Sequence, residues 1–423
     1  MKLFIRQIAL FILFLGALQS CEDHCEETVT YIRYDPIYKG YDAIRAEAGF
    51  KTAQDLHHPG KIYLYGQYLL INEINEGIHI FDNSDPSNPQ NLGFFNLPGN
   101  VDMAVRNNIL YADSYIDLVT IDISDITNPS LISRTEEVFP YGYNYLVSEK
   151  GIIVDWTETE VTEKRSCSTF ADGPQIWLFA EDASAHAVLS SNSSAPKAAP
   201  PTTGVGGSMA RFTIVNDYLY TVDHSNLRVF DLDQPTQPNN VSNPLIDNWG
   251  IETIFPYNGK LFIGSQNGMH IYDLQSPESP THLSEFEHVT SCDPVVVQGD
   301  YAFVTLRGGS NCGGFSNQLD IIDISNPSNP TLYKTYQMQS PFGLGIDGNK
   351  LFICEGTHGL KYFDITDLDA LSLEQHFTGV DAYDVIPNND VLIMTGQDGL
   401  MQFDYSSANT LTLISTIPVV QTQ

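Results

Sequence analysis

Short apolar runs separated by turn-forming residues dominate this sequence. In residues 99–131, apolar runs cover 101–105, 109–112 and 118–123, an Asn-containing turn lies between the first two, and a fourth run begins at Leu131 after a turn rich in Asp, Asn and Pro. Short runs that are rich in β-branched and aromatic residues and bounded by turn residues predict β-strands. Four strands in about 40 residues are typical of one blade of a β-propeller.

The same unit returns along the chain, and its clearest marker is an Asp that follows an apolar or aromatic residue at the end of a strand. These Asp residues are separated by 40, 109, 42, 50, 41 and 40 positions. A period of 40 to 42 residues indicates a repeat architecture. Because a Ser/Asn/Pro-rich segment follows each Asp, we interpret the Asp as the acceptor of an Asx turn. The series consists of Asp82, Asp122, Asp231, Asp273, Asp323, Asp364 and Asp404.

The two longer intervals decide the expected number of blades. The interval of 109 residues accommodates one degenerate unit, with strands expected at 143–147 and 151–156, and an insertion. Seven clear units and this one predict eight blades, and seven is the alternative if the region 140–208 does not complete a sheet. Residues 183–208 are rich in Ala, Ser, Pro and Gly, so we expect a flexible surface loop there. We read the glycine-rich stretch 203–207 as part of that linker.

The expected fold is therefore all-β, with four-stranded blades in one propeller domain that spans residues 57–423. A smaller insertion at 307–316 is expected to project from one blade. Blades that bury both faces against their neighbours form one ring, despite a chain length that would otherwise suggest two or three domains.

The N-terminus has the layout of a secretory signal peptide. Residues 1–20 carry Lys2 and Arg6 before an apolar stretch that is short for a membrane span. The sequence Leu-Gln-Ser-Cys that ends at Cys21 resembles a bacterial lipobox, although Gln19 departs from the usual small or β-branched residue. The resemblance implies cleavage before Cys21, acylation of that residue and a lipidated tether and lead-in at 21–56. Several acyl chains would anchor the protein stably.

The acidic residues Glu22, Asp23, Glu26 and Glu27 follow the expected lipid site. Such a run resembles the surface-export signal of lipoproteins in the Bacteroidetes group. We therefore expect an outer-membrane lipoprotein exposed at the cell surface, with a periplasm-facing location as the alternative.

The overall charge excludes one class of partner. With 52 acidic and 20 basic side chains, the chain has a formal net charge of −32. Such a surface repels phosphate backbones, so nucleic-acid binding is not expected. Contact with a membrane is expected through the lipid anchor alone, and the expected partner is an envelope or extracellular protein or a glycan.

The remaining cysteines suggest one disulfide. Cys292 and Cys312 belong to the same unit, and an oxidising compartment would permit a bond that closes a loop of about 20 residues. Cys354 lies in an apolar strand, and we expect it to be a buried thiol. The sequence assigns no partner to Cys25 or Cys167.

Two segments of the repeat resemble a known family. Residues 118–124 read LVTIDIS and residues 319–327 read LDIIDISNP, and both resemble the LVIVD repeat. The whole chain resembles the LVIVD-repeat lipoproteins of Bacteroidetes over roughly residues 57–416. The resemblance implies a β-propeller at the cell envelope, and it implies no activity and no role for particular residues.

The motifs of common enzyme classes are absent, but one set of charged residues stands out. The first strand of each unit opens with a charged residue in six of seven cases, and in a propeller this strand lines the central channel. These side chains would form a ring of formal charge −2 at one mouth of the channel. The ring either pairs its own charges or binds a cation such as calcium or a small polar ligand; no other cofactor is expected. Its members are Lys61, Asp102, Arg211, Glu252, Asp293 and Asp384, and Gly343 holds the seventh position.

The sequence thus predicts a non-catalytic scaffold at the cell envelope that binds a protein or a glycan. The alternative is a hydrolase or lyase that acts on carbohydrate or peptide with carboxylates at the channel mouth, a chemistry that the fold alone does not establish. A third possibility is a metal that fills the channel and only stabilises the ring.

Overall fold

In a computed structural model of the chain, the described residues are 26–139, 147–148, 150–166, 203–223, 225–242, 250–288, 294–309, 316–407 and 409–420. The chain divides into two compact units. The first comprises residues 1–39 and 150–182, and the second comprises residues 40–149 and 183–423.

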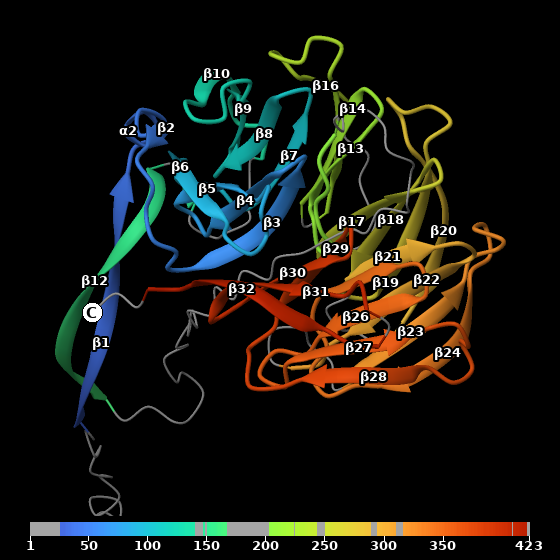
Figure 1. Cartoon of the computed structure of the whole chain (residues 1–423). Helices are drawn as coiled ribbons and strands as arrows, with labels where there is room; N and C mark the ends of the chain where they lie inside the picture. Colours follow the sequence, from blue (N-terminus) through green and yellow to red (C-terminus); the bar gives the residue numbers. More distant parts are fainter. Residues whose placement is uncertain are drawn as a thin grey trace, which may run out of the picture. The chain divides into compact units, whose positions relative to one another are not determined.

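The second unit contains seven antiparallel sheets that follow one another along the chain (Figure 1). Blade 1 contains β3 (Pro59–Tyr65), β4 (Tyr68–Glu73), β5 (Gly77–Asp82) and β6 (Gln90–Asn96), with β2 (Gly49–Lys51) added at its outer edge. Blade 2 contains β7 (Met103–Arg106), β8 (Ile109–Ser114), β9 (Asp117–Asp122) and β10 (Ser130–Thr135). Blade 3 contains β13 (Phe212–Val215), β14 (Tyr218–Val222), β15 (Leu227–Asp231) and β16 (Asn239–Ser242).

The remaining four blades repeat this arrangement. Blade 4 contains β17 (Ile251–Tyr257), β18 (Lys260–Ser265), β19 (Gly268–Asp273) and β20 (Thr281–Glu287). Blade 5 contains β21 (Val295–Gln298), β22 (Tyr301–Leu306), β23 (Gln318–Asp323) and β24 (Thr331–Gln337). Blade 6 contains β25 (Leu344–Asp347), β26 (Lys350–Cys354), β27 (Leu360–Asp364) and β28 (Ser372–Phe377). Blade 7 contains β29 (Asp384–Asn388), β30 (Val391–Gly396), β31 (Gly399–Asp404) and β32 (Thr412–Pro418).

Burial within each blade follows from its position between two neighbours. In β8 and β22 every residue after the first is buried, because both faces of these middle strands pack against adjacent blades. The outermost strands, such as β10 and β24, contain only exposed and half-buried residues. This difference explains why the middle strands read as continuous apolar runs, whereas the fourth strand of each unit is weakly marked in the sequence.

The recurrent Asp residues end the third strand of each blade, as the Asx-turn interpretation requires. In all seven blades a side-chain oxygen of this Asp accepts a hydrogen bond from the backbone N–H two residues later, over 2.7–3.4 Å. The prediction of a structural role for the series is confirmed. The repeat is kept because each blade needs the same turn between its third and fourth strands.

The ring closes without exchanging a strand between its first and last blades. Each inner strand contacts the inner strand of the next blade, and β3 of blade 1 contacts β30 of blade 7. Leu56, just before β3, forms a parallel bridge with Val419, and its carbonyl oxygen accepts the N–H of Val420 at 2.7 Å. His57 Nδ1 lies 2.7 Å from the carbonyl oxygen of Val420. The two ends of the propeller are thus joined mainly by side chains and single backbone contacts.

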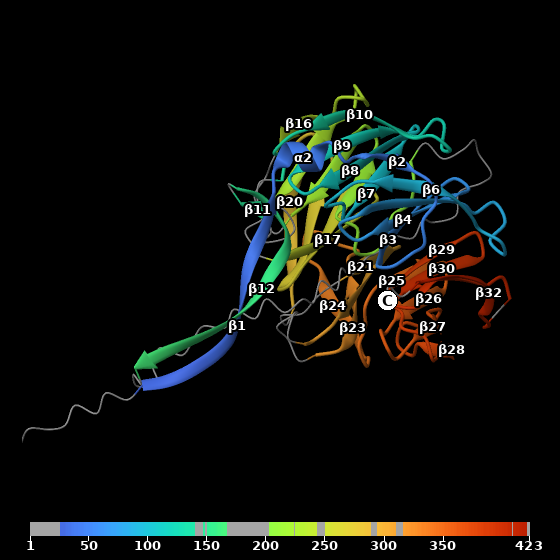
Figure 2. The same ribbon diagram turned by 90° about the vertical axis from the view of Figure 1, so that its left-hand side faces the viewer.

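The prediction of eight blades is wrong, and the alternative of seven is correct. Residues expected to begin a degenerate blade lie in β12 (Gly151–Ser166), which pairs antiparallel with β1 (Glu26–Lys39) in the first unit (Figure 2). The sequence of β12 gives the physical reason: after Trp156 it continues Thr-Glu-Thr-Glu, which places polar groups on both faces. Such a strand cannot be buried between two blades.

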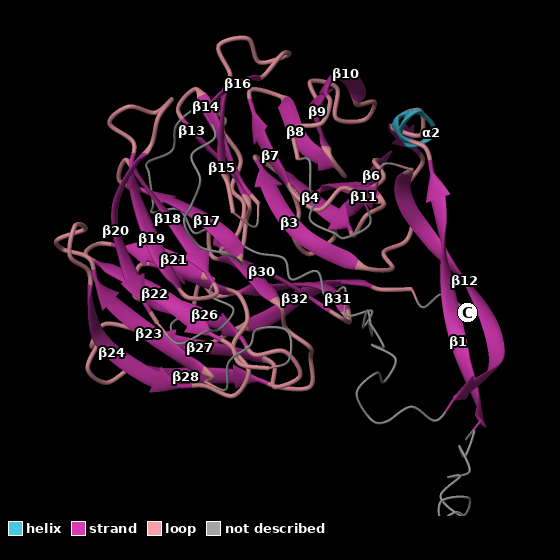
Figure 3. Cartoon of the chain, turned by 180° about the vertical axis from the view of Figure 1, so that it is seen from behind, coloured by secondary structure: helices cyan, strands magenta, loops and turns pink. Residues whose placement is uncertain are grey.

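The rest of the described secondary structure is brief. The described residues contain one short helix, α2 (Tyr41–Arg45) (Figure 3). The remaining strand is the two-residue β11 (Val147–Ser148). Among the described residues, no helix has the length and apolarity needed to cross a membrane.

Several expectations lie outside the described residues. These are the signal peptide, the lipid site Cys21, the disulfide between Cys292 and Cys312, and the ring member Asp293. Cys354 is described, and it is a buried free thiol as expected; burial raises its pKa well above its ordinary value.

Candidate functional site

The end of the predicted surface loop lies inside the ring, against the inner strands. Val205 exchanges two backbone hydrogen bonds with Leu64 of β3, at 2.7 and 2.8 Å, and the N–H of Gly204 donates to Val105 of β7 at 3.0 Å. The Ser208 hydroxyl oxygen accepts the N–H of Leu344 in β25. The expectation of a flexible surface loop is therefore wrong for residues 203–208, and residues 183–202 lie outside the described part of the chain.

This segment, residues 203–210, joins blades that are not neighbours. Its backbone bonds reach blades 1 and 2, Ser208 reaches blade 6, and the carbonyl oxygen of Ala210 accepts the N–H of Ile254 in blade 4 at 2.7 Å. Val205 and Met209 pack into the apolar cluster that blades 1, 6 and 7 share. We call residues 203–210 the axial segment, because they occupy the space that the inner strands surround.

The glycines of the axial segment are required by its close approach to Tyr63. A Cβ atom on Gly204 would lie 2.1 Å from Tyr63 Cε1 and 2.6 Å from the carbonyl oxygen of Leu64. On Gly206 it would lie 3.1 Å from the same aromatic ring. Residues with the composition of a linker are thus a well-packed part of the core. The absence of a side chain at Gly204 and Gly206 allows this backbone to lie against Tyr63.

Buried charges meet at the end of the ring where the inner strands begin. Lys61 Nζ lies 2.6 Å from Asp102 Oδ2, and both side chains are at most 6% exposed. Asp102 also accepts the backbone N–H groups of Met103 at 2.7 Å and Arg211 at 2.5 Å. Burial lowers the pKa of Lys61, against the opposing effect of Asp102. The charges of Lys61 and Asp102 therefore compensate each other. The hydrogen bonds of this pair join blades 1, 2 and 3.

A second carboxylate, Asp113, supports this ion pair from β8. Its Oδ1 accepts the N–H groups of Val101 at 2.7 Å and Asp102 at 2.9 Å, and the Nδ2 of Asn100 at 2.9 Å. Oδ2 is buried without a hydrogen-bond partner among the described atoms. Burial raises the pKa of Asp113 from 3.8 to about 7 in spite of these bonds.

Asp384 occupies the position next to Lys61 in the ring. It is fully buried, and neither of its carboxylate oxygens has a hydrogen-bond partner among the described atoms. Burial raises its pKa well above the ordinary value, and the charge of Lys61 opposes this effect only in part. The neighbouring Gly343 leaves room for it, since a Cβ there would lie 2.3 Å from Asp384 Oδ1.

The predicted charged ring is thus only partly a set of interacting side chains. Lys61 and Asp102 form an ion pair, and Asp384 lies close enough to Lys61 for their charges to interact. Arg211 reaches this group through its backbone, and its Nε lies 3.4 Å from the backbone carbonyl oxygen of Glu252. Within the described ranges, no three His, Cys, Asp or Glu side chains are grouped so that they could hold a metal ion. Within this group, Lys61 and Asp102 neutralise each other.

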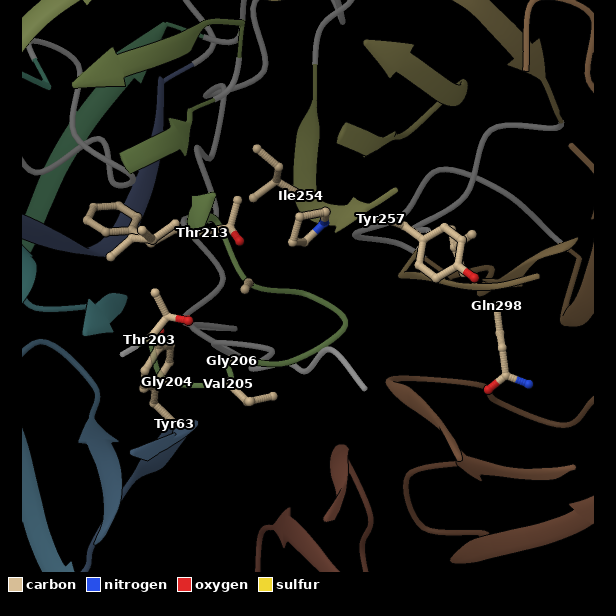
Figure 4. Close-up of a pocket in the computed structure, with 14 residues that line it drawn as sticks. Tyr63, Thr203, Gly204, Val205, Gly206, Thr213, Ile254, Tyr257 and Gln298 are labelled. Carbon is tan, nitrogen blue, oxygen red and sulfur yellow. The ribbon is translucent and has the colours of Figure 1, made fainter. Parts of the chain in front are cut away.

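A cavity of about 140 Å³ lies at the opposite end of the inner strands (Figure 4). One wall is the axial segment from Thr203 to Gly206, with Tyr63 of blade 1. The facing wall consists of residues from β13, β17 and β21, and Thr213, Tyr257 and Gln298 contribute its polar groups. None of the lining residues is charged.

The sequence did not reveal this cavity. The search for candidate sites in the sequence relied on charged residues. The residues that line this cavity are uncharged strand residues and a glycine-rich stretch that was interpreted as a linker. The available signal was the spacing of Gly204, Gly206 and Gly207 just before the strand that starts at Phe212. Glycine at such a place also indicates a close approach between backbone and core.

Comparison with known proteins confirms the repeat. The LVIVD repeat family matches residues 59–96, 100–136 and 291–338, which coincide with blades 1, 2 and 5. The chain is a β-propeller that carries LVIVD repeats. The other four blades of this LVIVD-repeat propeller have the same strand order, although their sequences do not match the family. Among curated proteins, none matches the chain.

Solved propellers resemble the chain in fold alone. A protein from Lactobacillus plantarum is 11% identical with a TM-score of 0.56, covering 86% of this chain and 97% of its own. The periplasmic gluconolactonase of Pseudomonas aeruginosa is 11% identical with a TM-score of 0.55, covering 85% and 96%. A functionally unknown protein from Desulfotomaculum acetoxidans is 13% identical with a TM-score of 0.52, covering 86% and 98%. Identities this low carry no activity over to this chain.

Proposed function

We propose that this protein is a non-catalytic lipoprotein of the cell envelope whose propeller serves as a scaffold for binding a protein or a glycan. The observation that carries the proposal is the occupied axis. The axial segment occupies the space between the inner strands, and Lys61 and Asp102 neutralise each other at the mouth where the charged ring was expected. The surfaces left for recognition are the loops and turns at the two ends of the ring and the cavity beside the axial segment.

The location is proposed from the N-terminal sequence. The lipobox-like residues that end at Cys21, and the acidic residues after them, favour a lipid anchor in the outer membrane and exposure at the cell surface. The formal charge of −32 is consistent with a domain that stays dispersed and contacts the membrane only through acyl chains.

The alternative of a carboxylate-dependent hydrolase or lyase receives less support. Asp102, one of the four carboxylates expected at the mouth, is buried and held by Lys61 and two backbone N–H groups. A general acid or base must reach the reacting atoms, and a carboxylate with these partners is not available for that purpose.

Three measurements test the proposal. Metabolic labelling with a clickable fatty acid should tag the wild-type protein and leave a Cys21→Ala variant unlabelled, and protease treatment of intact cells should remove the surface-exposed protein. Affinity capture from solubilised envelopes should then recover a defined protein or glycan. Hydrolysis of lactone, glycoside or peptide substrates that is lost in Asp102→Asn would overturn the non-catalytic assignment.

A further inference from the structure

The cavity beside the axial segment has features that set it apart from the rest of this acidic protein. The chain carries 72 charged side chains of Asp, Glu, Lys and Arg (52 acidic and 20 basic), yet none of the described residues that line the cavity is charged. Anionic or zwitterionic ligands need a partner charge when they leave water. The described lining therefore offers no partner charge to a phosphate, a carboxylate or a free amino acid.

The uncharged lining combines aromatic rings with groups that both donate and accept hydrogen bonds. Tyr257 is the half-buried aromatic residue of the lining, whereas Tyr63 and Phe212 are only 4% and 1% exposed. Thr203, Thr213 and Gln298 supply hydroxyl and amide groups (Figure 4). A sugar ring has apolar C–H faces and a rim of hydroxyl groups. An aromatic ring can pack against the C–H face, and hydroxyl and amide groups can form hydrogen bonds with the rim.

The polar groups around the cavity are held in place and keep capacity for a ligand. The Tyr257 hydroxyl oxygen accepts the N–H of Gly299 at 2.8 Å, which leaves its hydrogen available. The Gln298 Nε2 donates to the carbonyl oxygen of Gly348, which orients the amide and leaves Oε1 as an acceptor. The structure gives the Thr213 hydroxyl no hydrogen-bond partner among the described residues.

The volume limits the size of the ligand. At about 140 Å³ the cavity holds several water molecules. It is smaller than the pockets of roughly 300 Å³ or more that hold drug-sized molecules. A single ring with several hydroxyl groups fits this limit, and an oligosaccharide would have to extend beyond it.

We propose that the cavity binds one neutral monosaccharide unit, either as a free sugar or as the terminal residue of a glycan. This inference deepens the proposed function and rests on it, because it names a ligand class and a site for the glycan-binding alternative. The site lies at the end of the inner strands opposite to the Lys61–Asp102 pair.

Saturation-transfer NMR and calorimetry on the purified full-length mature protein in detergent test the inference. The panel contains glucose, galactose, mannose, xylose and N-acetylglucosamine, their methyl glycosides and matched disaccharides, with glucuronic acid and glucosamine as charged counterparts. We expect at least one neutral sugar to bind and the charged sugars to bind at least tenfold more weakly. Preference for methyl glycosides and disaccharides would identify the glycan end as the source, and preference for the reducing sugar would identify the free form.

Two variants locate the site. Thr213→Val and Gln298→Leu each remove one polar group, and each should weaken binding roughly fivefold to tenfold, the effect of about 1 kcal/mol. The control is Thr331→Val, at an exposed position of β24 away from the cavity, which should bind normally. Melting temperatures equal to that of the wild type show that a variant has folded.

The contrary outcomes are distinct. Failure of the whole panel, binding that both variants retain, or equal binding of glucuronic acid would each overturn the inference. Capture of an envelope partner by a wild-type protein that binds none of the sugars would support the scaffold function and overturn the sugar site. Failure of the wild-type protein in both capture and sugar binding would overturn both proposals.

Discussion

The side-chain amides of Asn83 and Gln402 bond to each other in both directions, at 2.8 and 2.9 Å, across the junction between the first and last blades. Gln402 is fully buried in β31, and its Nε2 also lies 3.1 Å from the carbonyl oxygen of Pro86. The Ser415 hydroxyl donates to the same carbonyl oxygen at 2.6 Å. Because no strand is exchanged between these blades, this polar contact is one of the few bonds that keep the ring closed.

Replacing Gln402 by Met should therefore weaken the junction between the first and last blades. The substitution keeps the volume, but it leaves the Asn83 amide and the Pro86 carbonyl with fewer partners. We expect a loss of about 1–3 kcal/mol in the free energy of unfolding, measured by chemical denaturation. Gln337→Met, at an exposed end of β24, is the matched control and should change little. A Gln402→Met protein as stable as the control would mean that closure depends on apolar packing alone.

Gly204 is predicted to tolerate no side chain. In a Gly204→Ala variant the new methyl group would meet the Tyr63 ring and the Leu64 carbonyl, so the axial segment must shift out of its hydrogen bonds. Overpacking of this kind costs about 1–3 kcal/mol. Gly49→Ala is the control, since a Cβ there meets no atom within 4 Å. Equal melting temperatures for the two variants would show that the axial segment is not held inside the ring.

The propeller could be predicted from the sequence because its period depends on residues with a local role. Each marker Asp forms its turn within two residues, so the pattern survives in every blade regardless of what lies outside the ring. The number of blades could not be derived in the same way. Residues 151–156 were correctly predicted to form a strand. The strand that pairs with them is β1, more than 100 positions earlier in the chain. Pairing between distant segments leaves no local signature.

The candidate site was missed for a related reason. Among the charged residues that open the inner strands, Lys61 and Asp102 form an ion pair, and Arg211 reaches Asp102 through its backbone N–H. Nothing in the composition of residues 203–207 shows that they enter the ring, because glycine serves both a mobile linker and a tightly packed backbone. Only the spatial position of Tyr63 against Gly204 and Gly206 separates the two cases.

The Asx turns provide a test of the repeat itself. In Asp122→Ala the N–H of Ser124 loses its acceptor, whereas in Asp122→Asn the amide oxygen can replace the carboxylate. Asn forms the same kind of bond at a later position of the blade 5 turn, where Asn326 Oδ1 accepts the N–H of Ser328 at 3.2 Å. We expect a small drop in melting temperature for the Ala variant and almost none for the Asn variant. Equal drops would indicate that the charge, rather than the turn bond, is what matters.

Asp113 should make stability depend on pH in the neutral range. Its pKa rises from 3.8 to about 7 on folding, so between about pH 4 and pH 7 the folded protein holds more protons than the unfolded chain. The stabilising contribution is therefore complete below about pH 4 and is lost as pH rises through 7. The difference in unfolding free energy between wild type and Asp113→Asn should accordingly decrease from pH 5 to pH 8. Asp122→Asn, at an exposed turn, is the control, and parallel pH profiles for wild type and Asp113→Asn would contradict the assignment.

The ion pair of Lys61 and Asp102 should show strong coupling in a double-mutant cycle. Lys61→Met leaves a buried carboxylate with only its N–H donors, and Asp102→Asn leaves a buried ammonium group without its counter-charge. Breaking one side of a buried pair costs about 3–5 kcal/mol, so each single variant should be strongly destabilised. The double variant should be less damaged than the sum, because neither charge remains buried alone, and Asn still accepts bonds from Met103 and Arg211. Additive losses would mean that the two groups are solvated independently, and the channel mouth would then be open to water and to ligands.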